Sequence, residues 1–221
     1  MRRLVVAVDG PSGSGKSTIS RRLALSLHAR YLDTGAMYRA VTWAVLRDGV
    51  DPDDPAAVYA VARRIRLSIG TDARRSLVEV DGTPVDRPIR GPEVTQSVSA
   101  VASVPEVRAL LVAEQRRIIA GAVRIVVEGR DIGTVVAPDA DLKIYLTASA
   151  DERARRRSAE TATAFAATAA DLARRDAIDS GRTVDPLRPA EDAVIFDTTN
   201  LDIDEVVARL AALLRNRVAT A

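Results

Sequence analysis

The sequence contains no cysteine, and it is poor in aromatic residues and in net charge. Without cysteine, disulfides, thiol catalysis and zinc–thiolate sites are excluded. Aromatic residues make up only 3% of the chain, which leaves few side chains for stacking on nucleic-acid bases. The net charge of +2 is far below that of a protein that coats nucleic acid. We therefore expect no nucleic-acid partner.

Long hydrophobic runs are also missing. No apolar stretch approaches the length of a membrane span, and residues 1–3 lead into a strand pattern rather than into a signal peptide. With 47% hydrophobic and 28% charged residues, the 221-residue chain can bury one sizeable core. We expect a soluble, cytoplasmic, monomeric protein without a membrane partner.

Lysine is nearly absent, since Lys16 and Lys143 are the only two, and arginine supplies almost all of the positive charge. The planar guanidinium suits bidentate contacts with phosphate. Arginines near loops are therefore candidates for phosphate binding, whereas those on helix faces are expected to be solvated.

Residues 10–17 (GPSGSGKS) match the pattern G-x-x-x-x-G-K-[ST] of phosphate-binding loops. An apolar run at residues 4–8 precedes the loop and a helical pattern follows it, as such a loop requires. Backbone N–H groups would then surround the phosphates, Lys16 would reach the outer ones, and the Ser17 hydroxyl would bind Mg²⁺. The sequence predicts a nucleoside triphosphate site; the alternative is a plain glycine turn that caps a helix.

Apolar strands alternate with helical patterns along most of the chain, which predicts an α/β fold with a central parallel sheet flanked by helices. The expected strands are residues 4–8, 30–32, 124–127, 142–146 and 193–196. The first should lie centrally, because a phosphate-binding loop works at the carboxyl end of a sheet strand. The expected helices include residues 93–103, 106–120 and 204–217.

Two regions depart from this alternation. Residues 66–69, 76–80 and 83–85 read as short strands with Asp81-Gly82 between the last two, which predicts a small antiparallel insertion with a hairpin. Residues 151–179 are rich in Arg and Ala and contain no strand pattern. They are either an exposed helical pair or a mobile lid whose arginines close over phosphates.

Missing motifs narrow the class of protein. The guanine-binding N-K-x-D motif is absent, as is the transporter signature L-S-G-G-Q. The residues that end the strands at 124–127 and 142–146 do not fit the acidic pair of a motor ATPase. A small phosphotransferase remains the best interpretation.

Two further segments follow predicted strands: D-T-G-A-M-Y-R at residues 33–39 and E-G-R-D-I-G-T at residues 128–134. Ligands bind at such strand ends in open α/β sheets. Together with residues 10–17, T-Q-S-V-S-A-V-A at 95–102 and residues 179–182, these segments resemble, in order along the chain, the bacterial cytidylate kinases, which are nucleoside monophosphate kinases.

The resemblance implies a P-loop kinase fold in three parts. These are a core domain of residues 1–33, 104–150 and 183–221, an acceptor-binding domain of residues 34–103 with the β insertion at about 66–91, and a helical lid of residues 151–182. The implied reaction is ATP- and Mg²⁺-dependent transfer of the γ-phosphoryl group to CMP or dCMP, giving CDP or dCDP and ADP.

The resemblance also implies roles for individual residues. ATP contacts fall on Gly10, Pro11, Ser12, Gly13, Ser14, Gly15, Lys16, Ser17 and Thr18, with Mg²⁺ on Ser17. The acceptor phosphate falls on Thr34, Arg39, Arg130 and Arg182, cytosine on Ser99, Arg108 and Asp131, and the ribose on Asp179 with its supporting Arg175. Catalytic roles fall on Lys16, Arg130, Arg153, Arg157 and Arg175.

Several assignments have structural alternatives. Thr34 is a candidate N-cap for the helix that follows it. Arg39 and Arg108 lie in helical patterns and could be solvated. Asp131 could approach Mg²⁺ or stabilise its own loop through Arg130.

The metal site and the function have alternatives too. Asp9 or Asp33 could serve as an outer-sphere Mg²⁺ residue. The acceptor could instead be UMP or a non-nucleotide alcohol. A protein of another class, a nucleotide-dependent switch that hydrolyses ATP slowly, would need no monophosphate.

Overall fold

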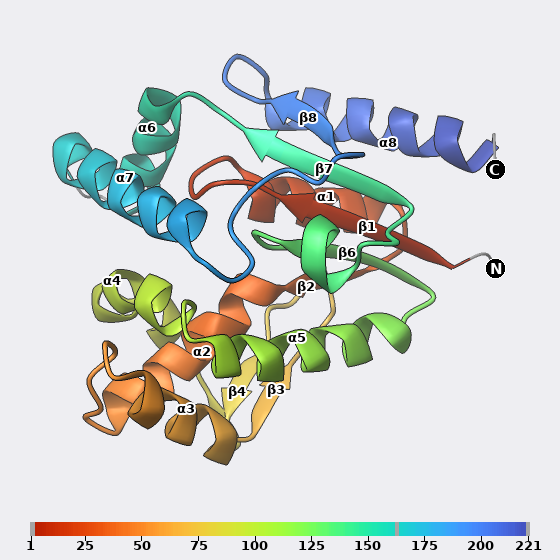
Figure 1. Cartoon of the computed structure of the whole chain (residues 1–221). Coiled ribbons are helices and arrows are strands. Elements are labelled where there is room, and N and C mark those ends of the chain that lie inside the picture. Colours follow the sequence, from red (N-terminus) through yellow and green to blue (C-terminus); the bar gives the residue numbers. More distant parts are fainter. Residues whose placement is uncertain (1–2, 162–163, 220–221) are drawn as a thin grey trace.

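A five-stranded parallel sheet forms the centre of the molecule (Figure 1). The computed structural model describes residues 3–161 and 164–219. The sheet contains β1 (Leu4–Asp9), β2 (Arg30–Asp33), β6 (Arg124–Glu128), β7 (Leu142–Thr147) and β8 (Val194–Asp197), in the order β2-β6-β1-β7-β8. The predicted parallel sheet is confirmed, with each strand within one or two residues of its expected bounds. As predicted, β1 lies in the middle.

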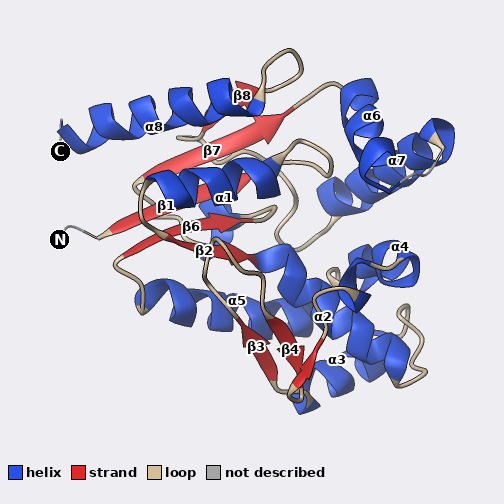
Figure 2. Cartoon of the chain, turned by 180° about the vertical axis from the view of Figure 1, so that it is seen from behind, coloured by secondary structure: helices blue, strands red, loops and turns tan. Residues whose placement is uncertain are grey.

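Helices cover both faces of this sheet (Figure 2). The helices in the described part of the chain are α1 (Lys16–Ser26), α2 (Thr34–Arg47), α3 (Pro55–Arg64), α4 (Pro92–Val101), α5 (Pro105–Ala120), α6 (Ala150–Thr161), α7 (Phe165–Gly181) and α8 (Ile203–Ala219), of which α3, α4, α6 and α7 lie away from the sheet (Figures 1 and 2). Alternate side chains of β1 point to opposite faces. Leu4, Val6 and Val8 pack with α1 and α8, whereas Val5 and Ala7 pack on the side of α2 and α5.

The antiparallel insertion is a separate three-stranded sheet of β3 (Leu67–Ile69), β4 (Val78–Val80) and β5 (Thr83–Pro84). The predicted hairpin is confirmed: Asp81 and Gly82 both have positive φ, 54° and 79°, between antiparallel β4 and β5. Positive φ at both central residues suits the twist of a tight hairpin. A 3₁₀ turn, η1 (Pro88–Arg90), leads from this sheet to α4.

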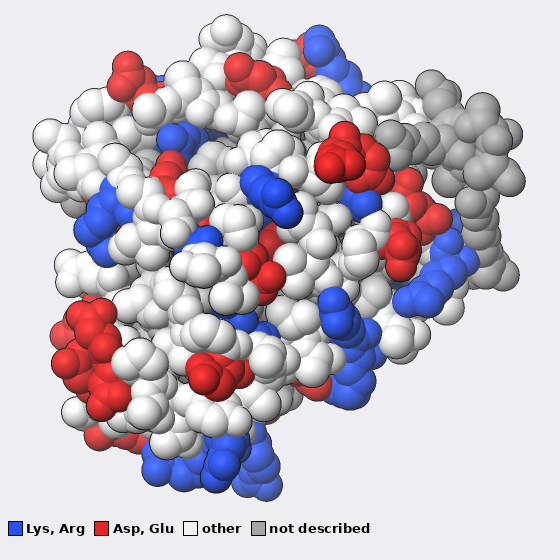
Figure 3. Space-filling view, in the orientation of Figure 1, with Lys and Arg blue, Asp and Glu red and all other residues white. Residues whose placement is uncertain are grey.

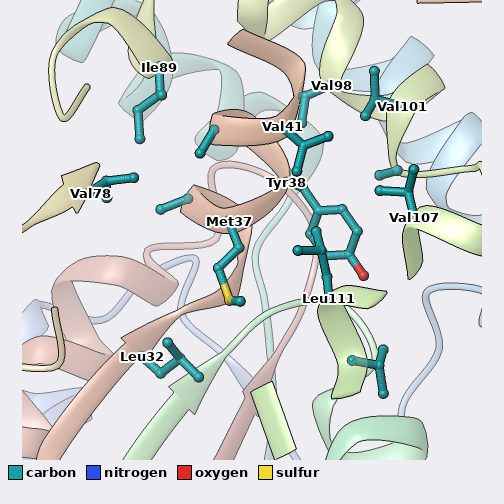
Figure 4. Close-up of a cluster of buried hydrophobic side chains, with 14 of the residues drawn as sticks. Leu32, Met37, Tyr38, Val41, Val78, Ile89, Val98, Val101, Val107 and Leu111 are labelled. Atoms are coloured by element: carbon teal, nitrogen blue, oxygen red, sulfur yellow. The ribbon is translucent and has the colours of Figure 1, made fainter. Parts of the chain in front are cut away.

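The region that follows the second strand is built around α2. Its Tyr38 and Val41 lie close to Val98 of α4 and to Val107 and Leu111 of α5 (Figure 4). These side chains belong to the same buried cluster as one face of the central sheet. The shared core fixes α2 and α4 relative to the phosphate-binding loop.

The region predicted as a helical pair or a lid contains α6 and α7, which lie side by side (Figures 1 and 2). Thr168, Leu172, Arg175 and Asp179 of α7 are buried, and α7 contacts α4. Their spacing of four, three and four residues places them on one helix face. One face of α7 is therefore buried, while its other face is exposed; the exposed helical pair and the mobile lid both stay predictions.

Charges of both signs are interspersed over the face shown in Figure 3. Throughout residues 3–161 and 164–219, no helix is both long enough and apolar enough to cross a membrane.

Candidate active site

The phosphate-binding loop connects β1 to α1, as the sequence predicts. Gly10 has a φ of +146°, and a Cβ there would collide with the carbonyl oxygen of Leu146. Gly15 caps α1 in the left-handed conformation, with a φ of 85°. Side chains are disfavoured at both positions, so the glycines of the motif are required by the backbone itself.

Lys16 is the first residue of α1, and its side chain turns back over the loop. Its Nζ donates to the carbonyl oxygen of Pro11 at 2.6 Å. Burial and the charge of Arg130 lower the pKa of Lys16, while the carboxylates of Glu128 and Asp9 oppose this shift. An anion bound in the loop would stabilise the ammonium form.

Asp9, at the end of β1, ties the loop to the neighbouring strand end. Its two carboxylate oxygens accept hydrogen bonds from the backbone N–H groups of Ile132 and Gly133, both at 2.8 Å. Burial raises the pKa of Asp9 to about 6 despite these two bonds. Since both oxygens are engaged, the geometry favours a positioning role for Asp9 over an outer-sphere Mg²⁺ role.

The loop opens into a cavity of about 340 Å³ that is lined by residues of the strand ends and of α1, α2, α4, α5, α6 and α7. Most predicted site residues line it: Ser12, Gly13, Gly15, Lys16, Ser17, Thr18, Thr34, Arg39, Ser99, Arg108, Arg130, Asp131, Arg157, Arg175, Asp179 and Arg182. The predicted residues that do not line it are Gly10, Pro11, Ser14 and Arg153. The residues that the sequence analysis missed are Gly35, Tyr38, Arg90, Val98, Ala102, Glu128, Gly129, Arg156 and Glu160, while Asp33 appeared only as a possible Mg²⁺ residue.

Thr34 lies inside the first turn of α2 and does not cap the helix, so that alternative is wrong. The N-cap is Asp33, whose side chain accepts a hydrogen bond from the backbone N–H of Ala36 at 2.9 Å. The Thr34 hydroxyl instead donates to the backbone carbonyl of Glu128 at 2.7 Å. This bond joins the start of α2 to the end of β6 beneath the cavity.

Arginines are frequent in the cavity lining. Arg39 donates to the Thr95 hydroxyl at 2.9 Å and to the Ile89 carbonyl at 3.3 Å. Burial and the nearby Arg175 lower the pKa of Arg39 to about 9, and burial lowers that of Arg175 to about 10. Both of these hydrogen-bond partners of Arg39 are uncharged. The site thus concentrates positive charge, which an anionic ligand would neutralise.

Arg130 and Asp179 connect the end of β6 to α7. Arg130 Nε donates to Asp179 Oδ2 at 2.9 Å, and Arg130 Nη1 donates to the Gly10 carbonyl at 3.1 Å. Arg182 Nε donates to the backbone carbonyl of Asp179 at 3.2 Å. Arg130 therefore touches the phosphate-binding loop and α7 at once.

Arg108 and Asp131 form a buried ion pair at the other end of the cavity. Arg108 is only 2% exposed, so the alternative of a solvated helix residue is wrong for it. Arg39 lines the cavity, so it is not merely a solvent-exposed helix residue either. Asp131 pairs with Arg108, while Arg130 pairs with Asp179, so Asp131 does not stabilise its loop through Arg130.

The arginines of α6 make different contacts. Arg153 pairs with Asp176 of α7, and it donates to the Ser12 carbonyl at 3.1 Å. Arg157 pairs with Glu160 at 3.0 Å. Arg156, which the sequence analysis missed, donates to the backbone carbonyl of Thr198 at 2.6 Å and to its hydroxyl at 3.0 Å.

Glu128 is the most informative residue that the sequence analysis missed. It is 3% exposed, and its Oε1 accepts a hydrogen bond from the Tyr31 hydroxyl. Its Oε2 is buried without a hydrogen-bond partner in the described part of the chain. Burial and the charge of Asp33 raise the pKa of Glu128, while Lys16 lowers it. The sequence carries one signal for Glu128, because it is an acidic residue that directly follows three apolar residues at the end of a strand.

Comparisons with known proteins identify the family of this chain. The model of the cytidylate kinase family matches residues 6–216. A cytidylate kinase of Nocardia farcinica is 58% identical over 222 residues, covering 98% of this chain and 96% of that protein. One from Rhodococcus jostii is 57% identical over 220 residues, covering 97% and 96%.

A solved structure of an uncharacterised protein from Eubacterium ventriosum shares the fold. It aligns with a TM-score of 0.54 at 8% identity, and covers 97% of this chain and 99% of its own. At this identity the likeness concerns the fold alone. The family model and the relatives span nearly the whole chain, and the parallel sheet with its phosphate-binding loop agrees with them. The chain therefore belongs to the cytidylate kinase family.

Proposed function

We propose that this protein transfers the γ-phosphoryl group of ATP to CMP, and to dCMP, giving CDP or dCDP and ADP. The observation that carries the proposal is one continuous cavity, which joins the phosphate-binding loop at Lys16 to the cluster of arginines and to the Arg108–Asp131 pair. The phosphate groups of a donor at Lys16 and of an acceptor at the arginines would meet in this cavity. The cytidylate kinases among the relatives support CMP as the acceptor.

The arginines would bring two polyanions together. Arg39, Arg130 and Arg182, with the Thr34 hydroxyl, would hold the acceptor phosphate opposite the γ-phosphate of ATP. An oxygen of the acceptor phosphate forms the new P–O bond as the bond between the γ-phosphorus and the β–γ bridging oxygen breaks, and ADP keeps the electron pair. The acceptor is already anionic, so positioning and charge neutralisation suffice and no general base is needed.

The Arg108–Asp131 pair would read the base. The Asp131 carboxylate can accept from the N4 amine of cytosine, while Ser99 and Arg108 can donate to N3 and O2. Uracil carries an acceptor oxygen at the N4 position, so the same carboxylate would disfavour UMP by about 1–3 kcal/mol. Asp179 would contact the ribose, with Arg175 beside it.

The site suits the magnesium ion that ATP carries. Glu128 offers the buried, unpartnered Oε2, and Asp33 and the Ser17 hydroxyl line the same cavity. Carboxylate and hydroxyl oxygens are the ligands that Mg²⁺ takes, together with phosphate and water. Ser17 would bind Mg²⁺ directly, with Glu128 and Asp33 facing its hydration shell. When bound, the ion would neutralise charge on the β- and γ-phosphates.

The lid would complete the site. We propose that Arg157 and Arg153 neutralise charge on the transferring phosphoryl group. Arg153 must exchange its contact with Asp176 to do so. We further propose a cytoplasmic monomer without a nucleic-acid partner, which the ATP chemistry, the absence of cysteine and the net charge of +2 support.

Initial-rate kinetics with CMP, dCMP, UMP, AMP, GMP and shikimate as acceptors test the function. We expect ADP formation to depend on CMP or dCMP, with UMP a poorer acceptor. Equal turnover of UMP would contradict the role of Asp131. ADP formation that no acceptor stimulates would exclude the kinase and favour a switch protein.

A further inference from the structure

Three charged side chains from three separate segments meet at one end of the cavity. Arg108 comes from α5, Asp131 follows β6, and Asp185 lies in the segment after α7. Arg108 Nη2 contacts Asp131 Oδ2, and Arg108 Nε donates to Asp185 Oδ2 at 2.9 Å. Arg108 and Asp131 line the cavity and Asp185 does not, so Asp185 can act on a ligand only through Arg108.

The orientation of Arg108 depends on these contacts. Its side chain is 3% exposed, so protein groups rather than bulk water hold the guanidinium. The guanidinium carbon lies 5.6 Å from the centre of the Tyr38 ring, and Nη1 reaches the Ala102 carbonyl at 3.4 Å. Asp185 holds the Nε side of the guanidinium, which leaves a single nitrogen, Nη2, for Asp131.

The backbone holds Asp185 in an uncommon conformation. Its φ is 51°, in the left-handed region that non-glycine residues rarely occupy, although aspartate tolerates it better than most. The segment is tied to the end of α7 by the backbone hydrogen bond from Leu187 N–H to the Asp179 carbonyl at 2.8 Å. The contact with Arg108 is thus a fixed feature of this segment.

Without Asp185, the guanidinium would be free to turn. A carboxylate and a guanidinium prefer two parallel hydrogen bonds. Arg108 would then engage both oxygens of Asp131. In the observed arrangement, Arg108 takes only Oδ2, and no hydrogen bond from the described residues reaches Oδ1. The second oxygen can therefore accept a hydrogen bond from a ligand.

We infer that Asp185 is a positioning residue that sets the base specificity of the acceptor site. By holding Arg108 Nε, it keeps the guanidinium directed at the base and keeps Asp131 Oδ1 available for an exocyclic amine. The inference rests on the proposed function, because it assumes a cytosine nucleotide in the cavity. It also links base recognition to the lid, since Asp185 follows the last turn of α7.

Two substitutions separate the effect of the Asp185 carboxylate from the effect of its backbone conformation. Asp185→Gly removes the side chain and accepts the positive φ, and Asp185→Asn keeps the shape and one acceptor oxygen but removes the charge. For Asp185→Gly we expect the KM for CMP to rise about tenfold and the CMP-over-UMP ratio of kcat/KM to fall about tenfold. The kcat at saturating CMP and the KM for ATP should stay within about twofold of wild type. For Asp185→Asn, the KM for CMP and the CMP-over-UMP ratio should lie between the values of wild type and of Asp185→Gly.

A matched control is Asp81→Gly, because Asp81 is another aspartate at positive φ, 54°, in the hairpin of the small sheet. It should leave both the KM for CMP and the ratio unchanged. Calorimetry of CMP binding without ATP gives a readout independent of turnover, and should show a weaker affinity by the same factor in Asp185→Gly.

The outcomes are distinct. Variants of Asp185 that keep the wild-type KM for CMP and the wild-type preference overturn the inference alone. A parallel change in the KM values for CMP and ATP, with the preference unchanged, also overturns it, because Asp185 would then only stabilise the fold. A wild-type protein without any preference for CMP overturns the proposed function, and the inference with it.

Discussion

Replacing Tyr31 by phenylalanine tests the buried support of the site. The Tyr31 hydroxyl donates to Glu128 Oε1, and both residues are 3% exposed. Burial and the charge of Glu128 raise the pKa of Tyr31, so the phenol stays a donor at every pH of interest. The substitution removes only this donor, because the ring can keep its contact with Arg21, whose guanidinium carbon lies 4.9 Å from the ring centre.

The magnitude follows from burial. Leaving a buried acceptor without its donor costs about 1–3 kcal/mol, and the buried Glu128 has no bulk water beside it to replace the lost hydroxyl. We therefore expect the free energy of unfolding to fall by about 2 kcal/mol. In a chain of 221 residues this lowers the thermal midpoint by about 4–8 °C. The Mg²⁺ concentration that gives half-maximal activity should rise, because Glu128 loses its fixed orientation.

Urea unfolding and thermal unfolding measure the first effect, and a Mg²⁺ titration of the initial rate measures the second. Tyr59→Phe is the control: Tyr59 is only half-buried, and the substitution should change the free energy of unfolding by less than about 0.5 kcal/mol. A double-mutant cycle with Glu128→Gln isolates the interaction free energy between Tyr31 and Glu128. If Tyr31→Phe unfolds within 0.5 kcal/mol of wild type, the hydrogen bond does not support Glu128 as we argue.

Three further predictions concern single residues. Because the pKa of Asp9 is raised from 3.8 to about 6, its protonated form stabilises the fold below pH 3.8, and this contribution of about 3 kcal/mol is lost as the pH rises through 6. In urea unfolding, the stability advantage of wild type over Asp9→Asn should fall between pH 4 and 7; a constant difference would refute the shift. Lys16→Met should lower kcat at least about 100-fold, since the positive charge at the outer phosphates is lost, while the thermal midpoint stays equal or rises because a buried charge is removed. Retention of kcat within tenfold would contradict the role of Lys16. Asp131→Asn should narrow the CMP-over-UMP ratio of kcat/KM about tenfold or more, because the new amide can donate to O4 of uracil; an unchanged ratio would leave Asp131 a structural role only.

The features that the sequence predicted well are governed by local chemistry. The glycines at Gly10 and Gly15 stand where the backbone takes conformations that side chains resist, so the loop can be recognised from its motif alone. The Asp81-Gly82 turn is a second case of the same kind. Apolar runs predicted the parallel strands because the inner ones, such as β1, are buried on both faces and need apolar residues throughout.

Local chemistry could not decide the helix cap before α2. Asp33 and Thr34 are both good N-cap residues, and the choice depends on one residue of register. The tertiary structure decides it, because the Thr34 hydroxyl is drawn to the Glu128 carbonyl, 94 residues away in the chain. The helix α3 and the π-helical turn η2 (Ile132–Val136) were likewise not predicted from the sequence.

The sequence by itself thus determined the phosphate-binding loop, the parallel strands and the set of charged residues at the strand ends, since each depends on neighbours within a few positions. The pairing of those charges depends on the strand order β2-β6-β1, which brings Tyr31 to Glu128, and on how α5 and α7 pack against the sheet. Only the tertiary structure could show that Arg130 pairs with Asp179, and that Arg108 lies between Asp131 and Asp185. Ion pairs over such separations form where packing brings charges together, and no periodicity along the chain encodes them.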